Sequence, residues 1–306
     1  MVSEYLMSKN GLATKTIAKE FIKISLGEKV PTVSELSELF NLPRGTVQNA
    51  LKTLHELEAI RLETKGHLGS YLIRKNTKLL LEISDIKGIV GTMPLPYSKR
   101  YEGLASGLIV ALENSYDIPA NLAYMRGAMS RISMVIQGRY DFAIVSRLAA
   151  ENFMNKYGGI ETVLSFGKGT YVRKHVVMFK DPDIHEIQDG MVVGTDNSSL
   201  DQCYLTEQAC KGKNVEYLPI EYSQIVQKIE NGELDAAVMN VDEVDDKNIV
   251  INCKELDWLD DKDTEAVLVT NANRLDLSFI LKDIIDIDTV ISIQNLVLEG
   301  KITPSY

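Results

Sequence analysis

The chain has 306 residues, of which 45% are hydrophobic, and this is enough to bury the cores of two domains. It contains no apolar run of the roughly 18–20 residues that cross a bilayer and no N-terminal signal peptide, so we expect a cytoplasmic protein without membrane contact. Its three cysteines include no Cys-x-x-Cys pair, which makes a disulfide framework or a zinc site unexpected, and its net charge of −10 argues at first against nucleic acid.

The charges are unevenly distributed along the chain. Residues 1–78 carry 12 Lys and Arg side chains against 8 Asp and Glu, whereas residues 79–306 carry 21 against 35. Such a split suggests two parts with different partners, the basic one suited to a phosphate backbone, although acidic surfaces also simply keep proteins soluble. We therefore expect a basic domain over residues 1–78 and a larger acidic domain over residues 79–306.

The first eighty residues predict three helices and a hairpin. A helix is expected over residues 14–24, and a second, capped by Thr32 or Ser34, ends at about residue 40. A tight turn at 41–43 leads into a third helix over about 43–58, in which Leu57 points inward. Alternating segments at 60–63 and 70–73 flank a turn-rich tip, which is typical of a hairpin. This order is that of a winged helix-turn-helix.

The third helix of such a module enters the major groove of DNA, and the hairpin approaches the neighbouring backbone. Arginine pairs with guanine, glutamine and asparagine pair with adenine, and lysine and threonine suit phosphate. The candidate DNA contacts are Ser34, Arg44, Thr46, Gln48, Asn49, Lys52, Lys65, His67 and Ser70. The alternative is a winged helix that contacts only proteins.

Residues 31–51 resemble the helix-turn-helix of GntR-type regulators, and residues 66–71 are similar to the glycine-rich wing of that family. The resemblance implies a DNA-binding transcription regulator. Two departures concern the operator contacts: Gln48 stands where GntR proteins usually have a second arginine, and the wing is one residue longer than the common Gly-x-Gly.

The acidic remainder alternates short apolar strands with helices, twice over. Strands at 88–91, 120–124 and 142–146 are separated by helices at 101–114 and 128–137. The same order recurs in strands at 191–194, 215–218 and 236–239 with helices at 199–210 and 222–230. Two βαβαβ units predict an α/β fold with two parallel-sheet lobes.

This arrangement resembles the type II periplasmic-binding-protein fold, which also forms the sensor domains of many bacterial regulators. In that fold the chain returns to its first lobe, here through a strand at 265–269 and a helix with apolar residues from 277 to 285. The resemblance implies a first lobe of about 86–176 and 265–306 and a second of about 177–264. Taken with the N-terminal module, the whole chain resembles the YhfZ-type regulators of the GntR group.

Ligands of open α/β sheets bind beyond the carboxyl ends of the strands, where helix N-termini offer N–H groups. Hydroxyls around Asn197, facing Arg126 or Arg147, would suit a carboxylate or another anion, although Ser198 or Ser199 could merely cap a helix. The candidate ligand contacts are Thr92, Tyr97, Ser98, Arg126, Gly127, Ser146, Arg147, Thr195, Asn197, Ser198, Ser199, Glu221, Tyr222 and Asn240.

Three functions remain open at this point. The first is a homodimeric regulator whose binding to a double-stranded DNA operator is modulated by a small, anionic effector held between the lobes. The second is an enzyme that acts on the small molecule in its cleft, but the sequence shows no catalytic set, metal spacing or cofactor motif. The third, a solute-binding protein for transport, would need an export signal.

Overall fold

The computed structural model describes residues 8–86, 88–113, 119–246, 252–256 and 261–306, and these residues form two compact units. The N-terminal unit contains residues up to 89 together with 112–119 and 274–284, and the C-terminal unit contains the rest. Two expectations concern residues outside the described ranges. These are the signal-peptide expectation, which concerns residues 1–7, and the end of a helix at Asn114. None of the described helices is both long and apolar enough to span a membrane.

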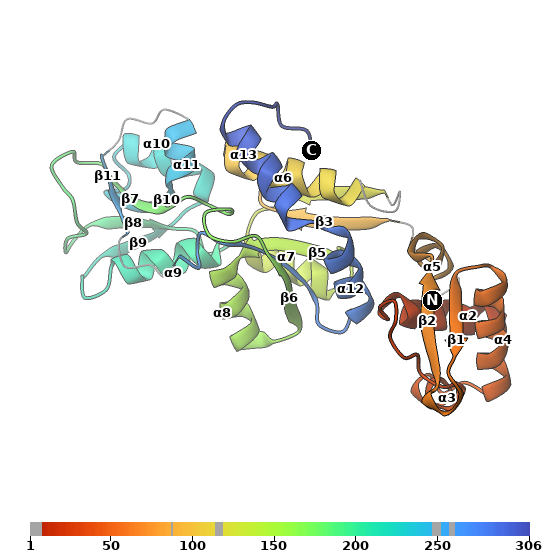
Figure 1. Ribbon diagram of the computed structural model, residues 1–306. Helices are drawn as coiled ribbons and strands as arrows, with labels where there is room; N and C mark the ends of the chain where they lie inside the picture. Colours follow the sequence, from red (N-terminus) through yellow and green to blue (C-terminus); the bar gives the residue numbers. More distant parts are fainter. Residues whose placement is uncertain (1–7, 87, 114–118, 247–251, 257–260) are drawn as a thin grey trace. The chain divides into compact units, whose positions relative to one another are not determined.

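The N-terminal unit consists mainly of the predicted helices and hairpin. Its elements are α2 (Lys9–Ile22), α3 (Val33–Leu39), α4 (Arg44–Glu56), β1 (Ile60–Thr64), a 3-10 turn (Gly66–Leu68), β2 (Ser70–Lys75), α5 (Thr77–Ile83) and α12 (Leu275–Ile284) (Figure 1). Helix α2 begins five residues before its expected start because the Ser8 hydroxyl accepts a hydrogen bond from the Gly11 amide at 3.1 Å. The boundary expected at residue 78 falls inside α5, which the sequence analysis did not foresee.

The helix-turn-helix is fixed by local chemistry. Thr32 is the N-cap of α3: its hydroxyl accepts the Glu35 amide at 3.2 Å, while its own amide donates to the Glu35 carboxylate at 2.6 Å. The turn places Asn41 at a φ of 50°, and Pro43 caps α4. Leu57 was expected to point inward, and this is wrong because α4 ends at Glu56 and Leu57 is 48% exposed.

Helix α12 is the apolar helix expected after the returning strand. Leu277, Ile280, Leu281 and Ile284 are all buried. It packs against α2 and is counted with the N-terminal unit, although the sequence places it directly after a strand of the C-terminal unit. The helix therefore belongs by contact to one unit and by chain connection to the other.

The first lobe of the C-terminal unit is built on a five-stranded sheet in the order β4-β3-β5-β12-β6. Strands β3 and β5 are parallel, whereas β12 runs antiparallel to both β5 and β6. The chain thus returns to its first lobe through β12, as the sequence predicts. The elements are β3 (Ile89–Met93), α6 (Lys99–Glu113), β4 (Ala120–Tyr124), α7 (Ala128–Ile136), β5 (Phe142–Ser146), α8 (Arg147–Tyr157), β6 (Ile160–Ser165), β12 (Ala266–Asn271) and α13 (Ile287–Leu298).

The second lobe contains a sheet in the order β11-β7-β10-β8-β9. Strand β8 is parallel to β9 and β10, but β7 is antiparallel to β10 and β11. Both sheets are therefore mixed rather than parallel, because one strand of each enters from a segment that crosses between the lobes. The elements are β7 (His175–Phe179), β8 (Val192–Thr195), α9 (Leu200–Ala209), β9 (Glu216–Pro219), a 3-10 turn (Tyr222–Gln224), α10 (Ile225–Glu230), β10 (Ala236–Asn240), α11 (Val241–Asp246) and β11 (Asn252–Glu255).

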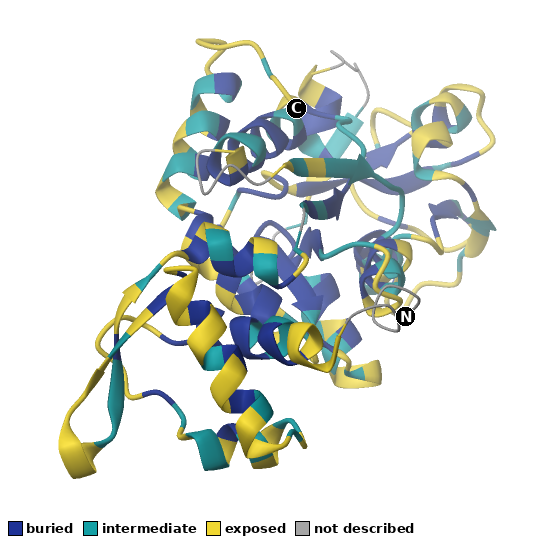
Figure 2. Cartoon of the chain, turned by 90° about the vertical axis from the view of Figure 1, so that its right-hand side faces the viewer, coloured by how far each residue is buried: buried dark blue, intermediate teal, exposed yellow. Residues whose placement is uncertain are grey.

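The cores lie on the faces of these sheets. Strands β5, β7 and β10 are buried along their whole length. Figure 2 shows buried residues, in dark blue, alternating with exposed ones, in yellow, along the helices. Alternate residues of β10 face opposite sides: Ala237 and Met239 pack with Ile225 and Ile229, and Val238 packs with Leu205. A continuous apolar strand is typical of a sheet covered on both sides.

Replacing Gly91 with alanine is expected to destabilise the C-terminal unit by about 1–3 kcal/mol, because a Cβ there would lie 2.1 Å from the Phe142 ring. The measurement is chemical denaturation of the full chain followed by circular dichroism. Gly45→Ala is the matched control, since no atom lies within 4 Å of its new Cβ and the residue is helical. Equal stability of the Gly91→Ala variant and the parent would show that the core yields at this point.

Candidate functional site

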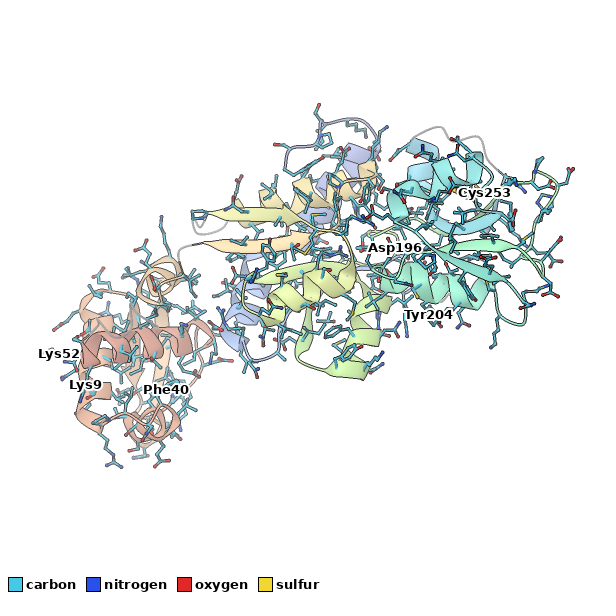
Figure 3. All side chains as sticks on the ribbon, turned by 180° about the vertical axis from the view of Figure 1, so that it is seen from behind. Lys9, Phe40, Lys52, Asp196, Tyr204 and Cys253 are labelled. Carbon is cyan, nitrogen blue, oxygen red and sulfur yellow. The ribbon has the colours of Figure 1, made fainter. Side chains whose placement is uncertain are left out.

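Helix α4 presents one polar, exposed face. Arg44, Gln48, Asn49 and Lys52 are exposed and Thr46 is half-buried, while the opposite side buries the core of the N-terminal unit. Lys52, labelled in Figure 3, lies with its Nζ 3.7 Å from a carboxylate oxygen of Glu56, a surface pair that can open readily. Ser34 is half-buried within α3.

The hairpin tip carries the remaining candidates for DNA contact. The Nζ of Lys65 lies 4.9 Å from the centre of the Tyr71 ring and 3.5 Å from the Glu63 carboxylate. His67 is exposed in the 3-10 turn, and the hydroxyls of Ser70 and Thr64 are 3.1 Å apart. All three candidates therefore sit at or beside the tip, and their contact with DNA stays a prediction.

A cavity of about 90 Å³ lies between the two lobes of the C-terminal unit. Half of the fourteen candidate ligand residues line it, and these are Tyr97, Arg126, Gly127, Ser198, Ser199, Tyr222 and Asn240. The other half do not line it, and these are Thr92, Ser98, Ser146, Arg147, Thr195, Asn197 and Glu221. Ligand contact itself stays a prediction for the lining residues.

The residues outside the cavity have other positions. Thr92, Ser98 and Thr195 are buried beside the strand ends, and Asn197 is exposed. Glu221 is exposed but reaches Arg126, with a nitrogen–oxygen distance of 2.8 Å. The rule of strand ends finds the right edge of each sheet but cannot say which side chains turn inward.

Helix α7 begins at the cavity without a side-chain cap. Its N-cap, Gly127, has a φ of 76°, and a Cβ at this position would lie 2.6 Å from the backbone oxygen of Ser198 on the other lobe. Glycine is therefore required at this close approach of the two lobes. The first N–H groups of α7 and its dipole face a space into which Ala128 and Ser199 also project.

Arg126 connects the lobes through two carboxylates. Its guanidinium lies 3.4 Å from Asp196 and 2.8 Å from Glu221. Asp196, labelled in Figure 3, also accepts the amide and hydroxyl of Ser198 at 2.9 and 2.6 Å and the Tyr222 amide at 3.0 Å. Asp196 is thus fully engaged in holding the loop after β8.

Asn240 has one donor left over. Its side chain is 2% exposed, and its Oδ1 accepts the Asp242 amide at 2.9 Å. Its Nδ2 has no hydrogen-bond partner in the part of the chain that the structure describes. Because a buried donor without an acceptor is costly, this amide indicates a missing acceptor in the cavity.

The sequence analysis missed several lining residues. Tyr101, Tyr171, Arg131, Asp201 and Glu243 all contribute to the cavity. Tyr101, Asp201 and Glu243 lie in the first turns of helices that follow strands, so extending the strand-end rule by one helical turn would have found them. Tyr171 lies in a crossover between the lobes and carries no such signal.

Arg131 donates its hydrogen bonds to neutral oxygen atoms rather than to carboxylates. Its Nε donates to the Ile144 carbonyl at 3.1 Å, and its Nη1 donates to the Met125 carbonyl at 2.8 Å. Its Nη2 donates to the Tyr171 hydroxyl at 3.1 Å. The guanidinium therefore fixes the wall of the cavity and orients a tyrosine that lines it.

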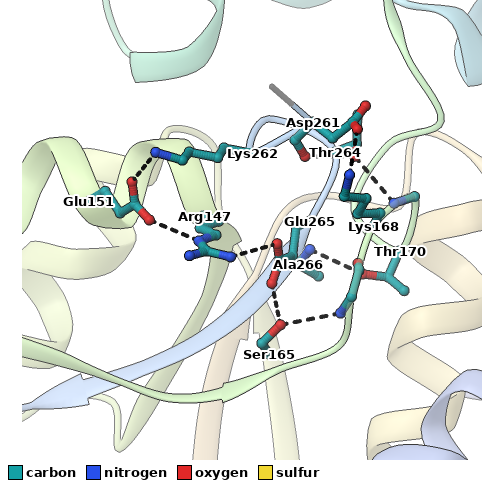
Figure 4. Close-up of polar contacts among 12 residues, drawn as sticks. Arg147, Glu151, Ser165, Lys168, Thr170, Asp261, Lys262, Thr264, Glu265 and Ala266 are labelled. Carbon is teal, nitrogen blue, oxygen red and sulfur yellow. Dashed lines mark hydrogen bonds and ion pairs between the residues drawn. The ribbon is translucent and has the colours of Figure 1, made fainter. Parts of the chain in front are cut away.

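Arg147 belongs to a polar network that joins the two crossovers (Figure 4). It lies 3.2 Å from Glu265 and 2.8 Å from Glu151, and Glu265 also accepts a hydrogen bond from Ser165. Lys168 of the first crossover forms an ion pair with Asp261 of the second, with 2.8 Å between Nζ and a carboxylate oxygen. Arg147 is thus placed to connect the lobes' joining segments, outside the cavity.

Asp201 is an acid of the cavity with a raised pKa. Burial raises its pKa to about 6, against the hydrogen bond that it accepts from the Ser146 hydroxyl at 2.8 Å. His175 and Arg131 act to lower the pKa and Asp263 to raise it. The folded state therefore binds the Asp201 proton more tightly than the unfolded state does.

The contribution of Asp201 to stability should be greatest below the ordinary aspartate pKa and should be lost as pH rises through about 6. Asp201→Asn is therefore expected to be neutral near pH 4 and to stabilise the chain above pH 7, by up to about 3 kcal/mol. Urea denaturation of both proteins across this range measures the difference. A pH-independent difference would contradict a raised pKa.

Comparisons with known proteins agree with this architecture. A helix-turn-helix domain family matches residues 25–72, and the YhfZ C-terminal domain family matches residues 76–306. The periplasmic aliphatic sulphonate binding protein SsuA from Escherichia coli aligns with a TM-score of 0.53 at 12% identity, over 70% of this chain and 74% of that one. The methionine-binding protein MetQ aligns with a TM-score of 0.50 at 15% identity, over 72% and 98%. These likenesses show the two-lobed binding-protein fold.

Two similar proteins are nearer in sequence. The protein YhfZ of Escherichia coli strain K12 is 34% identical over 304 residues, which is 98% of each chain. The crystal structure of YhfZ from Shigella flexneri aligns with a TM-score of 0.63 at 33% identity, over 75% of this chain and 97% of that one. The chain belongs to the YhfZ family, with an N-terminal helix-turn-helix and a two-lobed α/β domain.

Proposed function

We propose that this protein is a transcription regulator whose operator binding is modulated by a small ligand with an anionic group, held between the two lobes. The observation that carries the proposal is the presence, in one chain, of an exposed recognition face on α4 and a polar cavity with an uncapped helix N-terminus. The two features serve two different partners, which is what a ligand-controlled regulator requires.

The recognition face has the chemistry of base and backbone contact. Arg44 and Gln48 lie in the first turns of α4, where a recognition helix meets base edges, and Lys52 follows one turn later. The relative positions of paired helices decide which half-sites they can reach, so the proposal includes a homodimer. A protein that is strictly monomeric on DNA and in free solution would contradict it.

The anionic group of the ligand is inferred from three donors at one cavity. The N–H groups at the start of α7 favour negative charge, the Asn240 Nδ2 lacks an acceptor among the described residues, and Ser199 adds a hydroxyl that lines the same cavity. Arg126 already pairs with the exposed Glu221, which a ligand carboxylate could replace. Two proteins of this fold are named as binding methionine and aliphatic sulphonate, both of which carry an anionic group.

Arg44→Ala is expected to weaken binding to the operator by about 1–3 kcal/mol, because it removes a base contact, and to leave weak binding to scrambled DNA nearly unchanged. The measurement is a fluorescence-anisotropy titration at fixed salt against DNA from upstream of the protein's own gene. Arg61→Ala, an exposed arginine on β1, is the matched control and should bind as the parent does. Equal losses in both variants would indicate non-specific charge attraction.

Asn240→Asp is expected to abolish the response to a ligand while leaving basal operator binding intact, because the new carboxylate repels an anionic group but still accepts the Asp242 amide. Thermal shifts with small carboxylates and sulphonates identify active compounds, which are then added to the operator titration. Asn231→Asp, on the exposed end of α10, is the control. A variant that still responds as the parent does would place the ligand elsewhere.

A further inference from the structure

The cavity between the lobes has a second chemical character that an anion does not explain. Four tyrosine rings line it: Tyr97 and Tyr101 from the first lobe, Tyr171 from a crossover and Tyr222 from the second lobe. The centres of the Tyr97 and Tyr222 rings are 6.2 Å apart, and those of Tyr101 and Tyr171 are 5.2 Å apart with their planes at 74°. Rings grouped in this way present electron-rich faces that attract a cation.

The basic residues that line the cavity are all engaged by other groups. Asp196, Asp201 and Glu243 contribute three carboxylates, whereas Arg126 and Arg131 contribute two guanidiniums. Of these, Arg126 is paired with Asp196 and Glu221, and Arg131 is occupied by two carbonyls and a tyrosine. His175 lies 2.6 Å from Asp263, so it too is engaged with an acid of its own.

Of the carboxylates that line the cavity, Glu243 and Asp201 are the most suitable for binding a cation, because both are buried. Glu243 is 2% exposed and Asp201 is 7% exposed. The Tyr222 hydroxyl accepts the backbone N–H of Asn240 at 2.9 Å and bonds to Glu243, which joins a ring of the cavity to a buried acid. Burying a carboxylate is expensive unless a positive charge lies near it. The cavity therefore offers both faces of a cation site, aromatic rings and buried acid.

We propose that the ligand of this cavity is a small zwitterion, an α-amino acid or a close relative, which carries a protonated amine beside its carboxylate. The inference rests on the proposed function and adds a cationic group to the anionic one. The amine lies against the tyrosines and Glu243 or Asp201, and the carboxylate takes the Asn240 amide and the N–H groups of α7.

The test uses the full chain and three matched sets of probes. These are the proteinogenic L-amino acids, the carboxylic acids that lack the amine, and the amines that lack the carboxylate. Thermal shift identifies the amino acid that binds, and isothermal titration calorimetry then compares it with its two single-charge analogues. We expect the zwitterion to bind about tenfold or more tightly than either analogue, because each analogue leaves one half of the site unpaired.

Two variants remove the charge of a lining carboxylate while keeping the size of its side chain. Glu243→Gln keeps the shape and is expected to weaken binding of the amino acid by about tenfold while leaving the analogue without an amine unchanged. Asp201→Asn provides a second reading should Glu243→Gln fail to fold, which the melting temperature of the unliganded variant reveals. Glu230→Gln, an exposed acid on α10, is the control.

The inference fails if the acid without an amine binds as tightly as its amino acid, if a simple amine does so, or if no amino acid binds. It also fails if both acid variants bind the amino acid as the parent does. In each of these cases the proposed regulator function survives as long as Arg44→Ala weakens operator binding and another small anion gives a response that Asn240→Asp removes. Loss of those two effects would overturn the proposed function itself.

Discussion

Three buried carboxylates of the second lobe interact with donors on the first lobe. Asp196 takes the guanidinium of Arg126, Asp201 takes the Ser146 hydroxyl at 2.8 Å, and Asp242 takes the Nε of Arg100 at 3.0 Å. Asp196 and Asp242 accept backbone amides as well, from Ser198, Tyr222 and Arg173, so these acids are held from more than one side. The lobes therefore meet at one specific alignment, and Gly127 permits the closeness of that meeting.

The crossover between β6 and β7 is also held against the first lobe. Gln294 of α13 donates from its Nε2 to the carbonyls of Arg100 and Thr170, at 2.9 and 2.7 Å. The same crossover is held through Gly169, whose carbonyl accepts from Arg100 at 2.6 Å. In the proposed function, a ligand that binds between the lobes would change the free energy of the polar contacts between them. That change in free energy would then alter the binding of the DNA-binding module to its operator.

Helix α12 is grouped with the N-terminal unit, although it follows a strand of the C-terminal unit. It follows β12 of the first lobe after a short turn, and its buried face packs against α2. Phe279 and Ile280 of this helix line a second cavity together with Ile22 of α2.

The sequence was sufficient for features that depend on neighbouring residues. The capping box at Thr32, the left-handed turn at Asn41 and the alternation of strands with helices are set by local hydrogen bonds and by the period of apolar residues, so they can be read from a single chain. The strand-end rule likewise located the edges of both sheets, and Tyr97, Arg126, Tyr222 and Asn240 do line the cavity.

Only the tertiary structure decided which side chains share the cavity and how they are paired. The inward turn of Tyr171 and Glu243, the engagement of Arg126 by acids and the free Nδ2 of Asn240 depend on residues far away in the sequence. The mixed direction of both sheets depends on segments that cross between lobes. By itself, the sequence determined the modules and their order, because periodicity and capping are local; the charge balance of the site came from contacts over long distances, which no local pattern encodes.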